Sequence, residues 1–249
     1  MTGQHTVTSA AYDADVAEIY DLLYAGRGKD FAAEADAVAR VVRERRPQAR
    51  SVLDVACGTG EHLRRLATTF LEVAGLELSP AMCTVAQAKL PSGAVHVGDM
   101  RSFALGREFD AVCILTGTIG YAHDVDELCA TVRTMAAHLV PGGVLVIDPW
   151  WSPDTFLDGH VAHDVVHDDT RTVVRVSHSA RQGQAARHEA HYVVADGGGG
   201  IRHFSHVQML TLFTREDYLE ALQSAGCTAE HLTDAGGLPG RGLFAGVRR

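Results

Sequence analysis

A short apolar run that breaks into a glycine turn constrains this chain more than any other feature. Residues 51–60 read Ser-Val-Leu-Asp-Val-Ala-Cys-Gly-Thr-Gly, and apolar residues then recur with helical spacing over 61–66. A strand, a glycine turn and a helix in this order predict an open α/β sheet that binds a ligand at the carboxyl end of a parallel strand. At Gly58 and Gly60 a Cβ would block the approach of that ligand to the backbone.

Two acidic residues follow the next two predicted strands. Glu77 ends the apolar run 73–76, 17 residues after Gly60, and Asp99 follows the short run 95–97. An acid at the end of the second strand suits the two vicinal hydroxyls of a ribose. An acid after the third strand is placed to meet an adenine amino group. The pattern therefore predicts a nucleoside-containing ligand.

These spacings resemble those of the class I S-adenosylmethionine (SAM) methyltransferases. Dehydrogenases usually carry a third glycine where this chain has Leu63, so a dinucleotide pyrophosphate would fit poorly. If the glycine turn bound no ligand, the positions of Glu77 and Asp99 at the ends of the next two strands would have to be coincidental. The resemblance implies SAM as cofactor and a Rossmann-like seven-stranded α/β sheet. It implies these cofactor-binding residues: Tyr20, Ala56, Gly58, Gly60, Glu77, Leu78, Asp99, Met100 and Leu115.

Length, composition and charge exclude several classes of protein. At 249 residues the chain can form one large α/β domain, and it has no run of 18 apolar residues that could span a membrane. Residues 1–11 are polar and lack the apolar stretch of a signal peptide. Five scattered cysteines favour reduced thiols, so we expect a cytoplasmic protein. A formal charge of −9 argues against nucleic acid and anionic membranes as partners.

The sequence divides into a core with an insertion. Residues 1–148 and 209–249 alternate helical and apolar strand patterns, which predicts the SAM-binding core. Within the core we expect helices at 16–24, 31–46, 80–90 and 126–139, strands at 109–115 and 144–148, and a tight turn at 140–143. The hydrophobic pattern changes over residues 149–208. Apolar and polar residues alternate at 173–178, 188–194 and 201–205, as in half-exposed strands. We expect an inserted antiparallel β-sheet for substrate binding or dimerisation.

Several short patterns outside the generic fold are more specific. They include Gly-Arg-Gly-Lys-Asp at 26–30, Pro-Trp-Trp at 149–151 and Arg-Val-Ser-His-Ser at 175–179. With them, most of the chain resembles the TDP-amino-sugar N,N-dimethyltransferases of antibiotic biosynthesis. The residues that carry this resemblance are 12–13, 20–22, 26–31, 53–60, 75–79, 98–101, 119–121, 149–151, 175–179, 191–192, 211–213 and 240–244.

This narrower resemblance implies SAM as methyl donor, a thymidine-diphosphate (TDP) deoxyaminosugar as acceptor, and a homodimer. The chain differs from the family at two places near the expected sugar. Gly117 and Thr118 stand where the family usually has two serines, and Asp148 stands where it commonly has Glu.

The predicted reaction is an in-line displacement in which a neutral amine attacks a sulfonium methyl group, so alignment supplies much of the rate. An amine flanked by C–O bonds titrates near 8, and roughly a tenth of it is then neutral at pH 7. A phenol is a suitable hydrogen-bond partner and a poor strong base. The resemblance puts Tyr12 and Tyr121 beside the methyl group, so we expect these two to be catalytic. Tyr121 as a simple wall of the site, and His123 as a base, stay open as alternatives.

The two negatively charged phosphates of the acceptor require basic side chains in the binding site. Arg241 lies in the glycine-rich stretch 236–242, where a guanidinium can approach an anion closely. Trp150 and Trp151 leave the fifth strand towards the insertion, where one of them can line the sugar site. The full expected substrate-binding set is Lys29, Phe31, Thr118, Trp150, Trp151, Arg175, Ser177, His178, Arg181 and Arg241.

Fourteen histidines raise the question of a metal, and the sequence argues against one. His188-Glu189-Ala190-His191 is not an H-E-x-x-H motif, and on a strand His188 and His191 face opposite sides. We therefore expect no metal. Two other functions stay open at this point: a methyltransferase for another small amine or hydroxyl, and a non-catalytic SAM-binding partner subunit.

Overall fold

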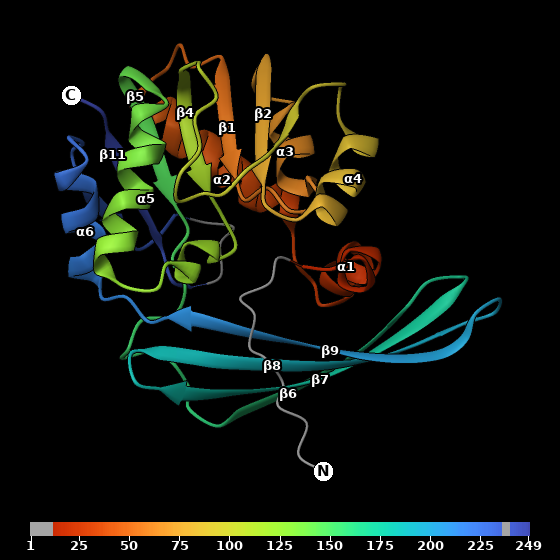
Figure 1. Cartoon of the computed structure of the whole chain (residues 1–249). Coiled ribbons are helices and arrows are strands. Elements are labelled where there is room, and N and C mark those ends of the chain that lie inside the picture. The colour runs from red at the N-terminus through yellow and green to blue at the C-terminus, as the bar shows by residue number, and fades with distance from the viewer. Residues whose placement is uncertain (1–11, 236–239) are drawn as a thin grey trace.

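The structure is a computed structural model that describes residues 12–235 and 240–249. Figure 1 shows an upper layer with a seven-stranded sheet and a lower layer with a second, four-stranded sheet. The order in the seven-stranded sheet is β10-β11-β5-β4-β1-β2-β3. Its strands are β1 (Ser51–Val55), β2 (Glu72–Glu77), β3 (Val95–Val97), β4 (Phe109–Ile114), β5 (Leu139–Ile147), β10 (Glu230–Leu232) and β11 (Leu243–Val247).

Five strands of this sheet are parallel, and β11 is antiparallel to β5 and to β10. Their apolar runs follow from burial on both faces. In β5, for example, Leu145 and Ile147 face one core and Val144 and Val146 face the other. This arrangement confirms the predicted class I methyltransferase fold.

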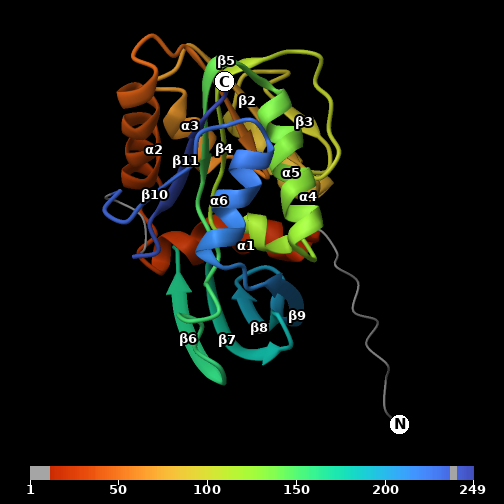
Figure 2. The same cartoon turned by 90° about the vertical axis from the view of Figure 1, so that its left-hand side faces the viewer.

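Helices cover both faces of the sheet, as the two views in Figures 1 and 2 show. On one face α2 (Phe31–Arg45) and α3 (Glu61–Leu66) supply apolar side chains, and on the other α5 (Val125–Ala137) and α6 (Arg215–Ser224) do so. Helix α4 (Pro80–Lys89) follows β2, and Ser79 caps it by accepting a hydrogen bond from the Met82 amide. Thr214 and Asp217 form a capping box at the start of α6.

The second sheet contains β6 (His160–His167), β7 (Arg171–Gln182), β8 (Ala185–Asp196) and β9 (Gly200–Thr211) in that order, all antiparallel. Three of these strands contain the segments predicted from alternation but extend further at both ends. Strand β6 was not predicted, because histidine and aspartate interrupt its valines. The predicted extra sheet therefore exists, with four strands.

Helix α1 (Ala14–Gly26) lies between the two sheets (Figure 1). Ile19 and Leu23 pack on the inner face of the four-stranded sheet, and Val16 and Ala17 pack on Met82 of α4. Lys89 of α4 forms an ion pair with Asp21 of α1, which ties the helix to the core. Through α1 the N-terminal part of the chain becomes a wall between the two layers.

The prediction of a tight turn at 140–143 was wrong. These residues belong to β5, where a register shift separates the Phe109–Leu139 pair from the Ala111–Val144 pair. Gly142 donates its N–H to the Arg248 carbonyl, and Arg248 donates to the Gly143 carbonyl, so the segment is paired with the chain's last residues. In the described part of the chain, no helix has the length and apolar character needed to cross a membrane.

Candidate active site

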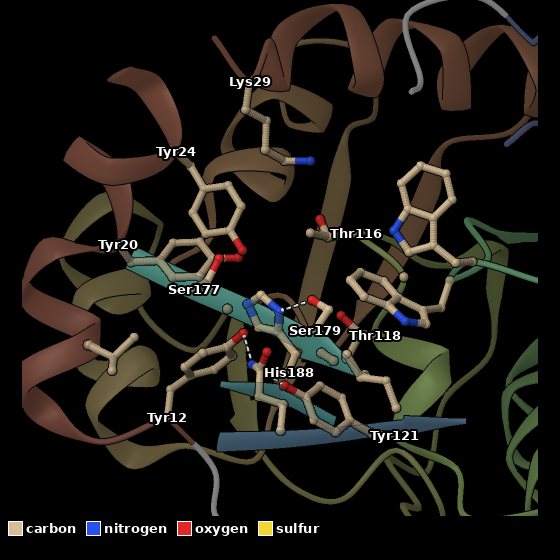
Figure 3. A pocket seen from close by; sticks show the side chains of 18 of the residues that line it. Tyr12, Tyr20, Tyr24, Lys29, Thr116, Thr118, Tyr121, Ser177, Ser179 and His188 are labelled. Carbon is tan, nitrogen blue, oxygen red and sulfur yellow. Dashed lines mark hydrogen bonds between the residues drawn. The ribbon is translucent and has the colours of Figure 1, made fainter. Parts of the chain in front are cut away.

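A cavity of about 790 Å³ lies where the two layers meet. Its roof contains the carboxyl ends of β1, β2, β3 and β4, its side wall is α1, and its floor is the inner face of the four-stranded sheet (Figure 3). This is the edge at which open α/β sheets bind ligands. Residues that are far apart in the sequence therefore share one cavity.

Glu77 is held in the cavity wall by backbone groups. Its carboxylate accepts hydrogen bonds from the amides of Gly58, at 2.9 Å, and Ser79, at 2.8 Å. Burial raises its pKa even though these amides favour the charged form. These two bonds fix the side chain at the end of β2, where a ribose was expected.

The two glycines of the turn have different roles. Both have positive φ, +57° at Gly58 and +79° at Gly60. A Cβ on Gly58 would meet no atom within 4 Å and would project into open space, whereas a Cβ on Gly60 would lie 3.1 Å from Ala86 and Leu90. Gly58 lines the cavity and Gly60 does not. The geometry therefore gives Gly60 a packing role, because the absence of a Cβ there permits the close approach of α4.

The expected adenine contact, Asp99, lines the cavity but is already paired. Its carboxylate binds the Arg101 guanidinium at 2.6 Å, and this hydrogen bond lowers its pKa. Tyr20, Ala56, Leu78 and Met100 also line the cavity, as expected for the cofactor set.

Leu115 lies outside the main cavity. With Asp54, it lines a neighbouring void of about 30 Å³ beneath the glycine turn, which has room for one water. One oxygen of Asp54 is buried there without a hydrogen-bond partner, and burial raises the pKa of this carboxyl to about 6. An orphaned carboxylate oxygen behind the turn suits a ligand cation reached through one water.

The two candidate catalytic phenols share one partner. Gln208 of β9 donates its amide N–H groups to the Tyr12 hydroxyl, at 2.6 Å, and to the Tyr121 hydroxyl, at 2.5 Å. Tyr12 precedes α1, and Tyr121 ends the short 3₁₀ helix η1 (Thr118–Tyr121). Burial raises the pKa of both phenols above their ordinary value, so both are neutral.

Arg241 lies beside both tryptophans. Its guanidinium is 5.7 Å from the Trp150 ring and 5.2 Å from the Trp151 ring. It pairs with Asp148 at 3.4 Å, and burial raises the pKa of Asp148 despite that pairing. Residues 236–239 of the glycine-rich stretch lie outside the described part of the chain. Arg241 and both tryptophans line the cavity as expected.

A second group of cations lies on the floor. Arg175 is buried, binds Asp164 at 2.6 Å and donates to the Ser177 hydroxyl at 2.9 Å. Arg27, from the end of α1, reaches the same Asp164 at 3.3 Å. Two guanidinium groups thus share one carboxylate, which leaves this end of the cavity positive.

Three expected substrate residues lie elsewhere. His178 is exposed on the outer face of β7, because side chains alternate along a strand and Ser177 takes the inner face. Arg181 lies near the end of β7 and donates to the Pro153 carbonyl outside the cavity. Phe31 lines the small void and packs against His62 instead of the main cavity.

Two further expected substrate residues, Lys29 and Thr118, line the cavity, and so does His123, the alternative base. Lys29 lies in the wall but is paired with the buried Glu34 at 2.7 Å. The Thr118 hydroxyl donates to the Leu115 carbonyl at 2.9 Å. His123 lies in the turn before α5, with its amide bound to Glu127 at 2.5 Å.

Sequence reasoning missed several cavity residues, among them Gln208, His188, Ser179, Tyr24 and Arg27. Cross-strand register could have found the first three, because Ser179 pairs with His188 and His188 pairs with Gln208. That register was not available from alternation within single strands. Among the residues described, no group of three or more His, Cys, Asp or Glu side chains could hold a metal ion.

Comparisons with known proteins bear directly on this cavity. A methyltransferase-domain family model matches residues 52–143, which contain the glycine turn, Glu77 and Asp99. The dTDP-3-amino-3,4,6-trideoxy-α-D-glucopyranose N,N-dimethyltransferase of Streptomyces venezuelae is 53% identical over 95% of this chain and 99% of its own length. This chain belongs to the TDP-amino-sugar N,N-dimethyltransferase family.

Two further N,N-dimethyltransferases of the family are each 48% identical. The enzyme of Saccharopolyspora spinosa for dTDP-4-amino-2,3,4,6-tetradeoxy-D-glucose is matched over 97% of this chain and 96% of its own length. The enzyme of Streptomyces fradiae for dTDP-3-amino-3,6-dideoxy-α-D-glucopyranose is matched over 96% and 92%. By their names, two of these three relatives act on an amine at C3 and one on an amine at C4.

Solved structures show the same architecture. The sugar N-methyltransferase KedS8 from Streptoalloteichus has a TM-score of 0.88 and 63% identity over 100% of this chain and 98% of its own. The SAM-bound amino pentose methyltransferase CalS10 from Micromonospora echinaspora has a TM-score of 0.83 and 48% identity, over 93% and 97%. The likeness extends over both sheets.

The cavity fits SAM on its own geometry. The open space above Gly58 admits a ligand against the backbone, and Glu77 presents a carboxylate to a ribose. The orphaned oxygen of Asp54 suits an ammonium group reached through water. SAM contains a ribose, an adenine and an ammonium, so the cofactor half of the cavity matches its chemistry.

Proposed function

We propose that this enzyme transfers methyl groups from SAM to the amine of a TDP-linked deoxyaminosugar, twice on the same nitrogen, in natural-product biosynthesis. The arrangement of the cavity carries this proposal. The cofactor wall with Gly58 and Glu77, and the polar floor of the antiparallel sheet, border one continuous space. The pair Tyr12 and Tyr121 lines that same space.

The two phenols orient the amine. SAM, when bound, would supply an electrophilic methyl group on its sulfonium, with the neutral thioether as leaving group. Each phenol oxygen accepts one hydrogen from Gln208, which fixes its direction and leaves its own O–H and a lone pair for the acceptor nitrogen. A neutral phenol can therefore hold an amine N–H without favouring the protonated amine, as a carboxylate would.

The nucleotide is bound through cations of the sheet and of the C-terminal segment. Arg27 and Arg175 share the carboxylate of Asp164, and the guanidinium of Arg241 lies against the rings of both tryptophans. Guanidinium forks match phosphate oxygens in geometry as well as charge. Both groups line the cavity, and the two phosphates of the acceptor can be neutralised there.

Methyl transfer to a matched set of nucleotide sugars tests this function. Purified enzyme with SAM should release S-adenosylhomocysteine with a TDP-aminosugar, and not with the TDP-sugar in which a hydroxyl replaces the amine. Equal release with both sugars would indicate a hydroxyl methyltransferase. Tight SAM binding without product on any aminosugar would indicate a non-catalytic SAM-binding subunit.

We further propose a cytoplasmic homodimer. The outer face of the four-stranded sheet exposes β-branched apolar side chains in adjacent rows: Val161, Val165, Val176, Val193 and Ile201. Ile201 is 77% exposed and Val161 is 64% exposed. Val165, Val174 and Val193 form one continuous apolar row across three strands, and His163, His178, Glu189 and His191 lie in the neighbouring rows. An exposed sheet face that carries such a row suits a two-fold contact with a second copy of itself.

A further inference from the structure

Four polar side chains form one row across the floor of the cavity. His160 of β6 pairs with Ser179 of β7, Ser179 with His188 of β8, and His188 with Gln208 of β9. All four line the cavity. Gln208 already has a role, since it binds both phenols, but the next position in the row has none.

His188 presents one free nitrogen to the cavity. Its Nδ1 lies 2.7 Å from the Ser179 hydroxyl oxygen, so Nε2 is the nitrogen left for a ligand. Figure 3 shows the imidazole in the middle of the floor, with the bond to Ser179 on one side. Burial, with the positive charges of Arg175 and Arg27 added to it, lowers the pKa of His188 to about 4. The ring is therefore neutral at neutral pH.

A neutral imidazole bonded to a serine can serve a ligand in two ways. When Ser179 donates to Nδ1, Nε2 carries the hydrogen and donates; when Nδ1 donates to Ser179, Nε2 accepts. A hydroxyl group can likewise donate or accept. The same ring is a poor base for the methylated amine, because an ammonium with a pKa near 8 does not give its proton to such a weakly basic group. The pair thus suits recognition of a hydroxyl better than proton transfer.

The pair lies next to the glutamine that binds the two phenols. Directly opposed residues on antiparallel strands have Cα atoms roughly 5 Å apart, so His188 neighbours Gln208 and the two phenols. An aminosugar whose nitrogen lies at the phenols has its next ring carbon within reach of that neighbour. We propose that His188, held by Ser179, binds a ring hydroxyl adjacent to the methylated amine and so selects sugars that carry one; this inference rests on the proposed function.

Three nucleotide sugars that differ only in ring hydroxyls test the inference. Every sugar of the series carries its amine on the ring carbon whose amine the wild-type enzyme methylates. For a C3 amine it comprises TDP-3-amino-3,6-dideoxyglucose with two ring hydroxyls, the 3,4,6-trideoxy sugar with one, and the 2,3,4,6-tetradeoxy sugar with none. His188→Phe keeps a ring of similar shape but removes the hydrogen bond. It should lower kcat/KM about tenfold for at least one hydroxyl-bearing sugar, and leave the tetradeoxy sugar within about twofold of wild type.

Companion variants separate recognition from folding. His188→Gln restores a polar group and should recover most of the loss, and Ser179→Ala should show a smaller loss on the same sugars only. His191→Phe is the matched control, because His191 lies on the same strand but on its exposed outer face. It should leave all three kcat/KM values unchanged.

Distinct outcomes identify distinct failures. An equal loss on all three sugars in His188→Phe and Ser179→Ala, or no loss on any, would overturn the hydroxyl assignment while the methyltransferase function stands. Failure of the wild-type enzyme to methylate any of the sugars would instead overturn the proposed function and, with it, this inference.

Discussion

Gln208 decides what the two phenols of the cavity can do. One amide group reaches both hydroxyl oxygens, so neither phenol can turn away without losing a hydrogen bond inside a buried cavity. The sequence alone singled out Tyr12 and Tyr121, but it gave no sign of Gln208. The contact joins three distant parts of the chain and depends on the register of the antiparallel sheet.

Removal of either phenolic hydroxyl should slow the reaction without abolishing it. We expect Tyr12→Phe and Tyr121→Phe each to lower kcat about tenfold to a hundredfold, because positioning and proton handling are lost. The double variant should lose more than either single one. Steady-state kinetics, with SAM affinity measured by calorimetry as a control, checks this. Complete loss in one single variant with both ligands bound would indicate an obligatory base, and wild-type rates in both would favour His123 or a water.

The pH dependence of the rate follows from the raised phenol pKa values. Groups whose pKa is raised stay protonated to higher pH, so neither phenol ionises as the pH rises from 6 to 10. The rate should therefore rise with pH through about 8, as the substrate amine loses its proton, and then stay level. A pH profile of kcat/KM for the aminosugar measures this. A second rise close to pH 10 would mean that a phenolate takes part.

At the scale of elements, the turn between β1 and α3 combines a ligand position and a packing position. Gly58→Ala and Gly60→Ala both place an L side chain at positive φ, which costs about 1–2 kcal/mol each. The Gly60 variant must also push its methyl group against α4, so it should unfold at a lower temperature than the Gly58 variant. The Gly58 variant should show the larger loss of SAM affinity. Calorimetry on both variants measures the unfolding temperature and the SAM affinity. If the Gly58 variant were the less stable one and the Gly60 variant the weaker SAM binder, the two roles assigned here would be wrong.

The strands of the core were the most predictable elements. Their apolar runs, their glycine turn and the acids Glu77 and Asp99 all lie within short sequence windows, and the structure places them at one edge of the sheet. Prediction failed where neighbouring residues of one motif were all assigned to the substrate site, although successive side chains of a strand point to opposite faces of the sheet. His178 belongs to a family pattern, yet its side chain lies on the opposite face from Ser177. Strand β6 was missed because its polar residues weaken the pattern.

At the scale of the whole molecule, the active cavity exists only because the second sheet lies under the first with α1 between them (Figure 1). No local pattern encodes that placement. It depends on contacts such as Ile19 and Leu23 against Tyr192 and Val194, which join residues more than 150 positions apart. The sequence could therefore indicate which residue types bind the ligands, but not which of them share the cavity.

The outer face of the second sheet predicts the state of assembly. Replacing Val165 and Val176 together by Glu would place two charges on an exposed apolar face, at no cost to the cavity on the other side. The wild-type protein should sediment as a dimer and the double variant as a monomer that still binds SAM. Analytical ultracentrifugation measures both. A wild-type monomer, or an unaffected dimer in the variant, would remove this face as the interface.

The number of methyl groups on the product tests the central proposal most directly. Mass spectrometry of a time course with SAM and a TDP-aminosugar should first show the nucleotide sugar with one added methyl group and then the same sugar with two. Fragmentation should locate both on the amine nitrogen. A product that stops at one methyl group, carries it on oxygen, or never forms although both ligands bind would contradict N,N-dimethylation by this enzyme.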